Sequence, residues 1–322
     1  MSNTISVGGF HHITAIAGAP QENLDFYLGV LGLRLVKKSI NQDAPDTYHF
    51  FFSDGAGSPG TDITFFPWPA MTKRKIGAGV WGEIGFVVPL GSLDWWETHL
   101  RAAGLTVGDQ ELRFGQKVLP FNDPHGMLLS LTETQTYEGF VFSAWADSPV
   151  PEEYQIRALG LATLTVRNEE PTVNFLGGAM GFRFFAEENG RRRYIVGEGL
   201  GGQRIDLIVN PQAASGSWGV GGVHHVAFRV PDSAAEAQVE QQILEHRGRS
   251  SGVIDRFWFK SVYVREPSGA LCEIATDGPG FGVDEDMAHL GETLVLPPWY
   301  ENQRSLIEAN LIPVTIPQGV RS

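Results

Sequence analysis

Two pairs of adjacent histidines are the groups of this chain best suited to bind a metal. His11 and His12 form one pair, His224 and His225 form the other, and a β-branched apolar residue follows each pair. A lone histidine in a strand is more often packed or exposed than a ligand, but a repeated pair favours one shared site. Neighbours in a strand point to opposite faces, so one histidine of each pair is expected to face that site. The second of each pair, His12 or His225, is in phase with the apolar residues of its strand.

Glu273 is the third candidate ligand. It lies inside the apolar run ALCEIAT, which follows the turn signal EPSG and reads as a buried strand. A buried carboxylate without a partner is costly, so Glu273 is expected to pair with Arg256 or Arg265, or to bind a metal. Two imidazoles and one carboxylate form the ligand set of non-haem iron(II) oxygenases, which leaves coordination positions open for substrate and O2.

Four weakly similar segments position these residues. Each begins with a strand-like run, continues with a helical stretch and ends with further strands, and in the first copy Leu24, Tyr27 and Leu31 have helical spacing. The equivalent points of the four copies are His12, Glu83, Leu161 and His225. A period of roughly 70 residues is typical of a diverged internal repeat.

The repeats predict a division of the chain into four parts. Residues 1–134 form an N-terminal domain of two modules, and residues 157–290 form a C-terminal domain of two modules. Residues 135–156 are polar and aromatic and are interpreted as the linker. Residues 291–322 form a C-terminal tail, in which two prolines precede a helical pattern.

Composition excludes several classes of partner. The 322 residues carry a formal net charge of −13, which argues against nucleic acid because phosphates would be repelled. No apolar run approaches the roughly 20 residues of a membrane-spanning helix. The single cysteine, Cys272, suits a reducing compartment, and the first residues do not resemble a signal peptide, so a cytoplasmic location is expected.

Taken together, these motifs resemble a known superfamily. The chain is similar nearly end to end to the vicinal-oxygen-chelate superfamily, which includes glyoxalases, bleomycin resistance proteins and extradiol dioxygenases. Within it, four segments resemble the hydroquinone-type ring-cleaving dioxygenases: HHITAI, HHVAFRVPD, REPSGALCEIATDGPGF and LPPWYENQRSLIEANL. The resemblance implies an Fe(II)-dependent enzyme, with Mn(II) as the alternative metal, that inserts O2 into a hydroquinone or catechol.

The resemblance also implies roles for particular residues. The metal ligands map onto His12, His225 and Glu273. Further catalytic residues around the metal map onto His11, Thr14, His224, Arg256 and Tyr263. Tyr263 is expected to donate to the bound oxygens, and Arg256 to orient a phenolate or carboxylate unless it is simply a surface residue.

The ligand set predicts how the modules pair. His12 lies in the first copy, whereas His225 and Glu273 lie in the fourth. The three can meet only if copy one pairs with copy four, which leaves copy two to pair with copy three. The predicted fold is therefore α+β, with four βαβββ modules paired into two open barrels.

The position of a fourth ligand distinguishes reactions within the superfamily. Glyoxalase-type isomerases commonly fill four ligand points, and here the fourth point is Thr64, a poor metal ligand. Three ligands leave room for a chelating diol and O2, which favours the dioxygenase. The equivalent points of copies two and three hold no histidine, so the second barrel is expected to be metal-free. Those points are Glu83, Leu161, Ser130 and Asp206.

Alternatives remain open at this level. One is a glyoxalase-like isomerase or thiol transferase that uses nickel or zinc, and another is a protein that sequesters an aromatic compound. The aromatic run Phe257–Phe259 has two interpretations: it lines a ring-binding pocket, or it packs in the hydrophobic core. The substrate is expected to be a small aromatic diol, and homo-oligomer formation is left open. No role is predicted for the remaining histidines: His49, His99, His125, His246 and His289.

Overall fold

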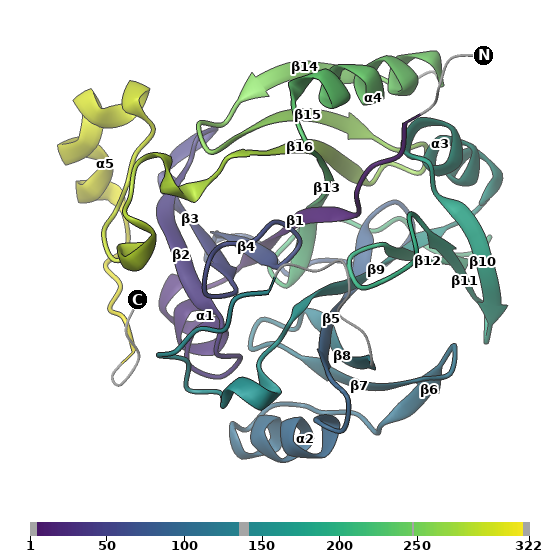
Figure 1. Ribbon diagram of the computed structural model, residues 1–322, viewed down its shortest axis with the longest axis horizontal. Helices are drawn as coiled ribbons and strands as arrows, with labels where there is room; N and C mark the ends of the chain where they lie inside the picture. The colour runs from purple at the N-terminus through teal and green to yellow at the C-terminus, as the bar shows by residue number, and fades with distance from the viewer. Residues whose placement is uncertain (1–4, 135–141, 247, 318–322) are drawn as a thin grey trace.

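One unit, a strand, a helix and three further strands, occurs four times in the computed structural model, which describes residues 5–134, 142–246 and 248–317 (Figure 1). The first module comprises β1 (Phe10–Ala17), α1 (Pro20–Tyr27), β2 (Arg34–Asn41), β3 (Ala44–Ser53) and β4 (Asp62–Pro67). The second comprises β5 (Trp81–Pro89), α2 (Leu93–Ala102), β6 (Glu111–Arg113), β7 (Gln116–Asn122) and β8 (Leu128–Thr134). The third comprises β9 (Ala158–Val166), α3 (Glu170–Met180), β10 (Arg183–Glu188), β11 (Arg191–Ile195) and β12 (Arg204–Val209). The fourth comprises β13 (Gly222–Val230), α4 (Ser233–Glu245), β14 (Ser250–Asp255), β15 (Phe259–Arg265) and β16 (Leu271–Pro279).

The modules pair as the ligand set predicts. One eight-stranded sheet has the order β14-β15-β16-β13-β1-β4-β3-β2, and the other has the order β10-β11-β12-β9-β5-β8-β7-β6. The antiparallel pair β1–β13 joins the first module to the fourth, and the antiparallel pair β5–β9 joins the second to the third. The predicted α+β fold and its module pairing are confirmed.

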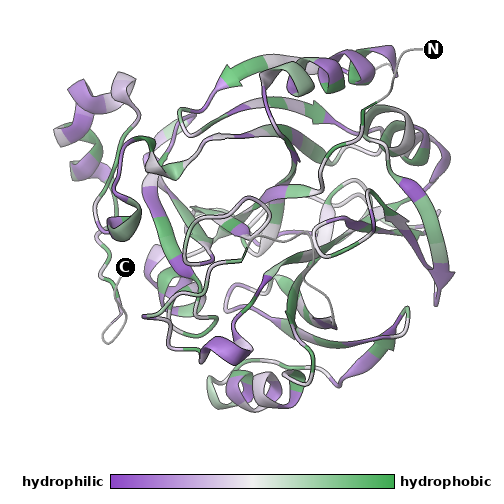
Figure 2. Ribbon diagram, viewed as in Figure 1, coloured by the Kyte–Doolittle hydropathy of each residue, from purple (hydrophilic) through white to green (hydrophobic). Residues whose placement is uncertain are grey.

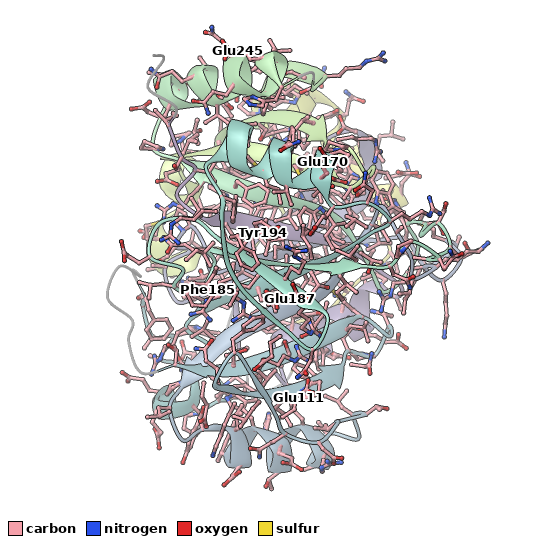
Figure 3. All side chains as sticks on the ribbon, turned by 90° about the vertical axis from the view of Figure 1, so that its right-hand side faces the viewer. Glu111, Glu170, Phe185, Glu187, Tyr194 and Glu245 are labelled. Atoms are coloured by element: carbon pink, nitrogen blue, oxygen red, sulfur yellow. The ribbon has the colours of Figure 1, made fainter. Side chains whose placement is uncertain are left out.

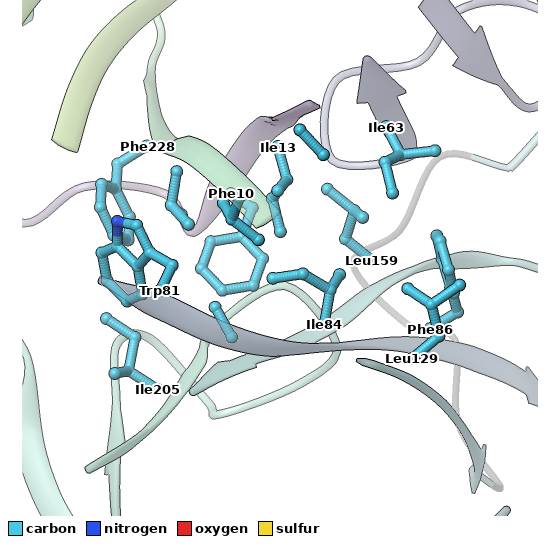
Figure 4. Close-up of a cluster of buried hydrophobic side chains, with 14 of the residues drawn as sticks. Phe10, Ile13, Ile63, Trp81, Ile84, Phe86, Leu129, Leu159, Ile205 and Phe228 are labelled. Atoms are coloured by element: carbon cyan, nitrogen blue, oxygen red, sulfur yellow. The ribbon is translucent and has the colours of Figure 1, made fainter. Parts of the chain in front are cut away.

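The strands at the centre of each sheet are covered on both faces. All eight residues of β1 are buried, as is typical of a strand without a solvent face. Figure 4 shows Phe10 and Ile13 of β1 pointing toward Trp81 and Ile84 of β5. The Trp81 indole also donates to the Leu271 carbonyl of β16, at 2.7 Å. One face of β1 therefore packs against the second sheet, which leaves its other face for the interior of the first barrel.

The helices lie outside the sheets. Figure 2 shows hydrophilic and hydrophobic residues side by side on α2 and α4, as expected for helices with one buried face. The Asp232 side chain caps α4 by accepting from the amides of Ala234 and Ala235. In the first module, α1 ends at Tyr27, so Leu31 of the predicted helical pattern is buried beyond the helix end.

Exposed carboxylates contribute to the negative charge. Figure 3 shows Glu245 of α4, Glu170 of α3 and Glu111 of β6 at the outside of the molecule, where all three are exposed. In the described part of the chain, no helix is long and apolar enough to cross a membrane.

The tail contains a short 3-10 helix, η4 (Pro298–Gln303), followed by α5 (Arg304–Asn310), and lies beside β2 and β3 (Figure 1). Ile307 and Leu311 of this tail pack with Ile40 of β2. Three further 3-10 helices lie in the connections: η1 (Glu152–Tyr154), η2 (Phe281–Val283) and η3 (Met287–His289). The division into domains 1–134 and 157–290, linker 135–156 and tail 291–322 stays a prediction, and residues 135–141 of the linker lie outside the described residues.

Candidate metal centre and active site

Three side chains from three strands of the first barrel converge on one point. His12 comes from β1, His225 from β13 and Glu273 from β16, and each is at most 4% exposed. The Nε2 atoms of His12 and His225 are 3.3 Å apart. The Glu273 Oε2 atom lies 3.4 Å from the first nitrogen and 2.9 Å from the second. Within the described residues, this is the group of histidines, cysteines and carboxylates close enough together to hold a metal ion.

Two β-bulges decide which way the paired histidines point. The β1–β13 ladder shifts register between Phe10 and His12, which makes His11 the extra residue on β1. It shifts again where Thr14 opposes His225 and Ala15 opposes Val223, which makes His224 the extra residue on β13. A bulge re-aims a side chain and interrupts strict alternation. The prediction that paired histidines face opposite sides is therefore wrong for His224 and His225, because both line the same cavity.

The first histidine of each pair contacts the second through a ring nitrogen. His11 Nδ1 lies 2.9 Å from His12 Nδ1, and His224 Nδ1 lies 2.8 Å from His225 Nδ1. An imidazole that presents Nε2 to a metal carries its proton on Nδ1, and a partner for that proton fixes the ring orientation. Burial, followed by the neighbouring histidine, lowers the pKa of both His11 and His224 to about 3, so both rings are neutral. A neutral ring can accept the Nδ1 proton of a neighbour that presents Nε2 to a metal.

Glu273 is ionised although it is fully buried. Burial by itself would raise its pKa, but His12 and His225 outweigh that effect and hold the pKa well below the usual range. Its Oε1 accepts a hydrogen bond of 2.5 Å from Ser261. The two arginines considered as partners are engaged elsewhere: Arg256 pairs with Asp43, and Arg265 donates to the Gly269 carbonyl.

The chemistry of this donor set fits a divalent metal. The Oε2 of Glu273 is buried and accepts no hydrogen bond of normal geometry, although two ring nitrogens lie close to it. Ligand atoms bonded to one ion at about 2.1 Å and at right angles to each other are about 3.0 Å apart. The three separations of 2.9, 3.3 and 3.4 Å are close to that value. His12, His225 and Glu273 therefore form a candidate metal-binding triad.

A cavity of about 230 Å³ opens from this triad. An apolar cavity of about 150 Å³ holds benzene, so this one has room for a substituted ring. Aromatic side chains form much of its wall: Phe51, Phe66, Trp68, Trp258 and Phe259. The sequence offered two roles for the run Phe257–Phe259, ring binding and core packing. Trp258 and Phe259 fit both, because they line the cavity and are also buried among core residues.

Arg256 and Tyr263 lie together on the wall of the same cavity. The Arg256 Nε donates to the Tyr263 hydroxyl oxygen at 3.2 Å. Burial, followed by the charge of Glu273, raises the pKa of Tyr263, so its hydroxyl stays protonated. That proton is available to another acceptor, because the oxygen already accepts from Arg256.

His49 is a cavity residue for which the sequence predicted no role. It lies on β3, its Nε2 is 2.9 Å from the Thr64 hydroxyl, and its ring centroid is 3.9 Å from that of Phe51. Thr64 in turn contacts the Thr14 hydroxyl at 2.8 Å, which places Thr14 in a chain of polar groups beside the triad. Burial, followed by the charge of His12, lowers the pKa of His49 well below its usual value. His49 alternates along β3 with the core residue Phe50. This alternation was the sequence signal that could have placed His49 on the cavity side of the strand.

The second barrel has ion pairs at the equivalent points. Glu83 bonds to Arg113 and lies 3.2 Å from the nearest nitrogen of Arg191. Asp206 accepts from Arg193 at 2.8 and 2.9 Å. Guanidinium groups at these positions would repel a cation. The expectation that this barrel is metal-free stays a prediction. These ion pairs give it an electrostatic reason beside the lack of histidines at the equivalent points.

Sequence comparison identifies the class of protein that this fold and site define. The model of the Glyoxalase/Bleomycin resistance protein/Dioxygenase superfamily matches residues 9–131. Relatives similar over almost the whole chain are named ring-cleaving dioxygenases, and the chain belongs to this family of the superfamily.

Individual relatives make the likeness more specific. The chain is 39% identical over 316 residues to "Putative ring-cleaving dioxygenase MhqA" of Bacillus subtilis, covering 96% of this chain and all of the relative. It is 34% identical over 302 residues to "Chlorohydroquinone/hydroquinone 1,2-dioxygenase" of Sphingobium indicum, covering 92% of this chain and 93% of the relative.

Solved structures agree on the fold. A crystal structure titled as a putative dioxygenase from Bacillus subtilis matches with a TM-score of 0.91 at 40% identity, covering 97% of this chain and 99% of the other. Glyoxalase I from Zea mays matches with a TM-score of 0.63 at 15% identity, covering 84% of this chain and 92% of the other, which shows a shared fold alone.

Proposed function

We propose that this protein is an Fe(II)-dependent dioxygenase that cleaves the ring of a hydroquinone or catechol with O2. The observation that carries the proposal is the triad of His12, His225 and Glu273, whose donor atoms lie 2.9–3.4 Å apart beside an aromatic-walled cavity. Two histidines and one carboxylate on one side of an ion are the ligand set of Fe(II) oxygenases. The names of the relatives support the reaction class, and Mn(II) is the alternative metal.

A metal bound there would lower the pKa of a coordinated hydroxyl and bring the diol and O2 together. The protein's own groups bind and orient the ring. The aromatic wall contacts its faces, and Tyr263 donates its hydroxyl proton to a diol oxygen. His224 also lines the cavity. A neutral ring that accepts from His225 at Nδ1 carries its own proton on Nε2, so His224 serves as a donor to a diol oxygen and not as a base.

The remaining assigned residues position these groups. With His12 Nε2 presented to a metal, His11 would accept from His12 Nδ1 and fix the orientation of that ring. Thr14 bonds to Thr64, which also holds His49 at the cavity wall. Arg256 holds the Tyr263 oxygen, so that the phenol presents its proton to the cavity.

Oxygen uptake after anaerobic loading with Fe(II) tests the proposal. Protein shown to contain iron should consume O2 with at least one member of a panel of hydroquinones and catechols. The Glu273→Gln variant should lose iron and uptake together. Glu301→Gln, which changes an exposed carboxylate in the tail, is the matched control and should retain both.

The outcomes separate the alternatives. Iron-loaded protein that consumes no O2 with any diol would contradict the dioxygenase. A glyoxalase-like isomerase or thiol transferase using zinc or nickel consumes no O2. A protein that sequesters aromatics should still bind a diol after Glu273→Gln, which would show as unchanged quenching of tryptophan fluorescence.

The proposal includes a cellular setting. A cytoplasmic location suits Cys272, which is a free and buried thiol. The expected partners are a small aromatic diol and O2, without nucleic acid or membrane, and the net charge of −13 supports the exclusion of nucleic acid. Homo-oligomer formation is left open, and gel filtration with light scattering would test it.

A further inference from the structure

The guanidinium of Arg256 is held between a phenol and a carboxylate at the edge of the candidate active site. Its Nη1 and Nη2 donate to the two carboxylate oxygens of Asp43, at 3.3 and 2.9 Å. Its Nε donates to Tyr263, and its charge lies 5.2 Å from the centre of the Tyr263 ring. Arg256 is 15% exposed and Asp43 is 74% exposed, so the pair lies where the cavity meets solvent.

Asp43 is placed by bonds on both sides of its turn. It follows β2, and its amide donates to the Asn41 side chain at 2.9 Å. The neighbouring Gln42 side chain donates to the Arg256 carbonyl at 3.0 Å, and the Gln42 carbonyl accepts from Tyr300 of the tail. The turn is thereby tied to the fourth module and to the tail, and the carboxylate faces the guanidinium.

The pairing sets the charge that an incoming ring meets. Among the described residues that line this cavity, Arg256 is the single lysine or arginine. Asp43, which lines the same cavity, cancels its charge in a two-point contact. A ring bearing a carboxylate could not pair with Arg256, because Asp43 already neutralises that cation. The ring carboxylate would also be repelled by the Asp43 carboxylate. An uncharged diol meets no such repulsion.

We propose that Asp43 is a specificity-determining residue that makes this site select uncharged diols over diols bearing a carboxylate. The inference rests on the proposed function and deepens it by naming the substrate class. Arg256 then serves to orient Tyr263 and not to bind an acidic substituent. The sequence left two kinds of anion open as partners of Arg256, a phenolate and a carboxylate. The inference rules out the carboxylate.

The test compares hydroquinone with 2,5-dihydroxybenzoate, which differs by one carboxylate. Binding is measured anaerobically by quenching of tryptophan fluorescence, because Trp68 and Trp258 line the cavity. Oxygen uptake gives kcat/KM for the same two compounds with iron-loaded protein. Wild type should prefer hydroquinone in both measurements. Asp43→Asn keeps the side-chain shape, removes the charge, and should shift the ratio toward the acid on the order of tenfold.

Asp46→Asn is the matched control. Asp46 is an exposed acid on β3, outside the residues that line the cavity, and its loss changes net charge equally. It should leave the ratio of the two compounds unchanged. Wild-type protein that binds 2,5-dihydroxybenzoate with the same affinity as hydroquinone would overturn the inference. So would an Asp43→Asn ratio equal to that of wild type or a control that shifts as much.

Failure of the proposed function looks different. If neither compound consumes O2 but fluorescence shows a preference for hydroquinone that Asp43→Asn abolishes, the charge selection stands and the dioxygenase does not. If O2 is consumed with an unchanged ratio in Asp43→Asn, the dioxygenase stands and the charge selection is overturned.

Discussion

Glu273 shows how single residues determine this site. Its carboxylate has no exposed surface, yet the neighbouring imidazoles keep it ionised, with Ser261 bonded to the oxygen that does not face them. Burying a charge is tolerated only where partners replace the lost water. The partners of Glu273 are therefore as important as the ligands themselves, and each can be tested separately.

Ser261→Ala should weaken metal binding without removing a ligand. The hydroxyl bonds to Glu273 Oε1 at 2.5 Å, and loss of such supporting bonds typically costs about 10–100-fold in metal affinity. Competition with a chelator would measure the change. Ser250→Ala should leave affinity unchanged, because this hydroxyl of β14 in the same sheet bonds to Glu240 of α4 and not to a candidate ligand. Equal affinity in both variants would contradict a supporting role for Ser261.

Thr64→Val tests whether Thr64 occupies an empty ligand point. The substitution keeps the shape but removes the hydroxyl shared with Thr14 and His49. Loss of these buried bonds should cost about 1–3 kcal/mol in the free energy of unfolding, measured with urea. Metal content should stay at the wild-type value. A loss of metal comparable to that of Glu273→Gln would show that the three-ligand interpretation is wrong.

Helix α4 carries a buried carboxylate that affects the stability of the fold. It packs on β13 and β16, the strands that carry His225 and Glu273, and its Glu236 has no exposed surface. Neither carboxylate oxygen of Glu236 has a hydrogen-bond partner in the described part of the chain. Burial raises its pKa from the ordinary 4.5 to about 7, although Lys260 opposes the shift. The helix therefore carries a stability cost that depends on pH.

Stability should fall as pH rises from about 4.5 to 7 through this one group. A raised folded-state pKa means that the native state binds the proton more tightly across that window, so deprotonation favours unfolding. Glu236→Gln removes the charge and should stabilise the protein at pH 8 by on the order of 1–3 kcal/mol, with little effect at pH 4. Urea unfolding at the two pH values measures the difference. Glu245→Gln, on the exposed side of α4, should show no such pH-dependent gain. A Glu236→Gln gain that is equal at both pH values would contradict the assigned cause.

The whole molecule depends on pairing between distant parts of the chain. Each sheet takes one module from each half, and the β1–β13 and β5–β9 ladders join the halves (Figure 1). The candidate metal centre lies across the first of these ladders. The chain must therefore bring its first and last quarters together before the three donor atoms can meet.

Cleavage of the chain within residues 135–141 should leave one associated particle. A protease site introduced there would cut between the second and third modules, but the two ladders would still hold the fragments together. Gel filtration should show both fragments eluting at the volume of the uncut protein, with bound metal retained. Denaturant should then separate them. Two particles that separate without denaturant would contradict the observed pairing.

Much of the architecture was accessible from sequence because it is local or repeated. The histidine pairs, the acidic residue in an apolar strand and the four repeats are visible in the chain. The module pairing was also derivable, since three ligands in two distant copies can meet in one way.

Tertiary structure decided what depends on register between distant strands. The bulges at His11 and His224 exist only where β1 pairs with β13, so strand alternation alone gave the wrong face for His224. His49 and the Asp43–Arg256 pair enter the cavity for the same reason, because β3 and the fourth module meet only in the closed barrel. Sequence by itself determined which residues can do chemistry. The pairing of distant strands decided which of them face one cavity, because that depends on geometry spanning more than 200 residues of chain.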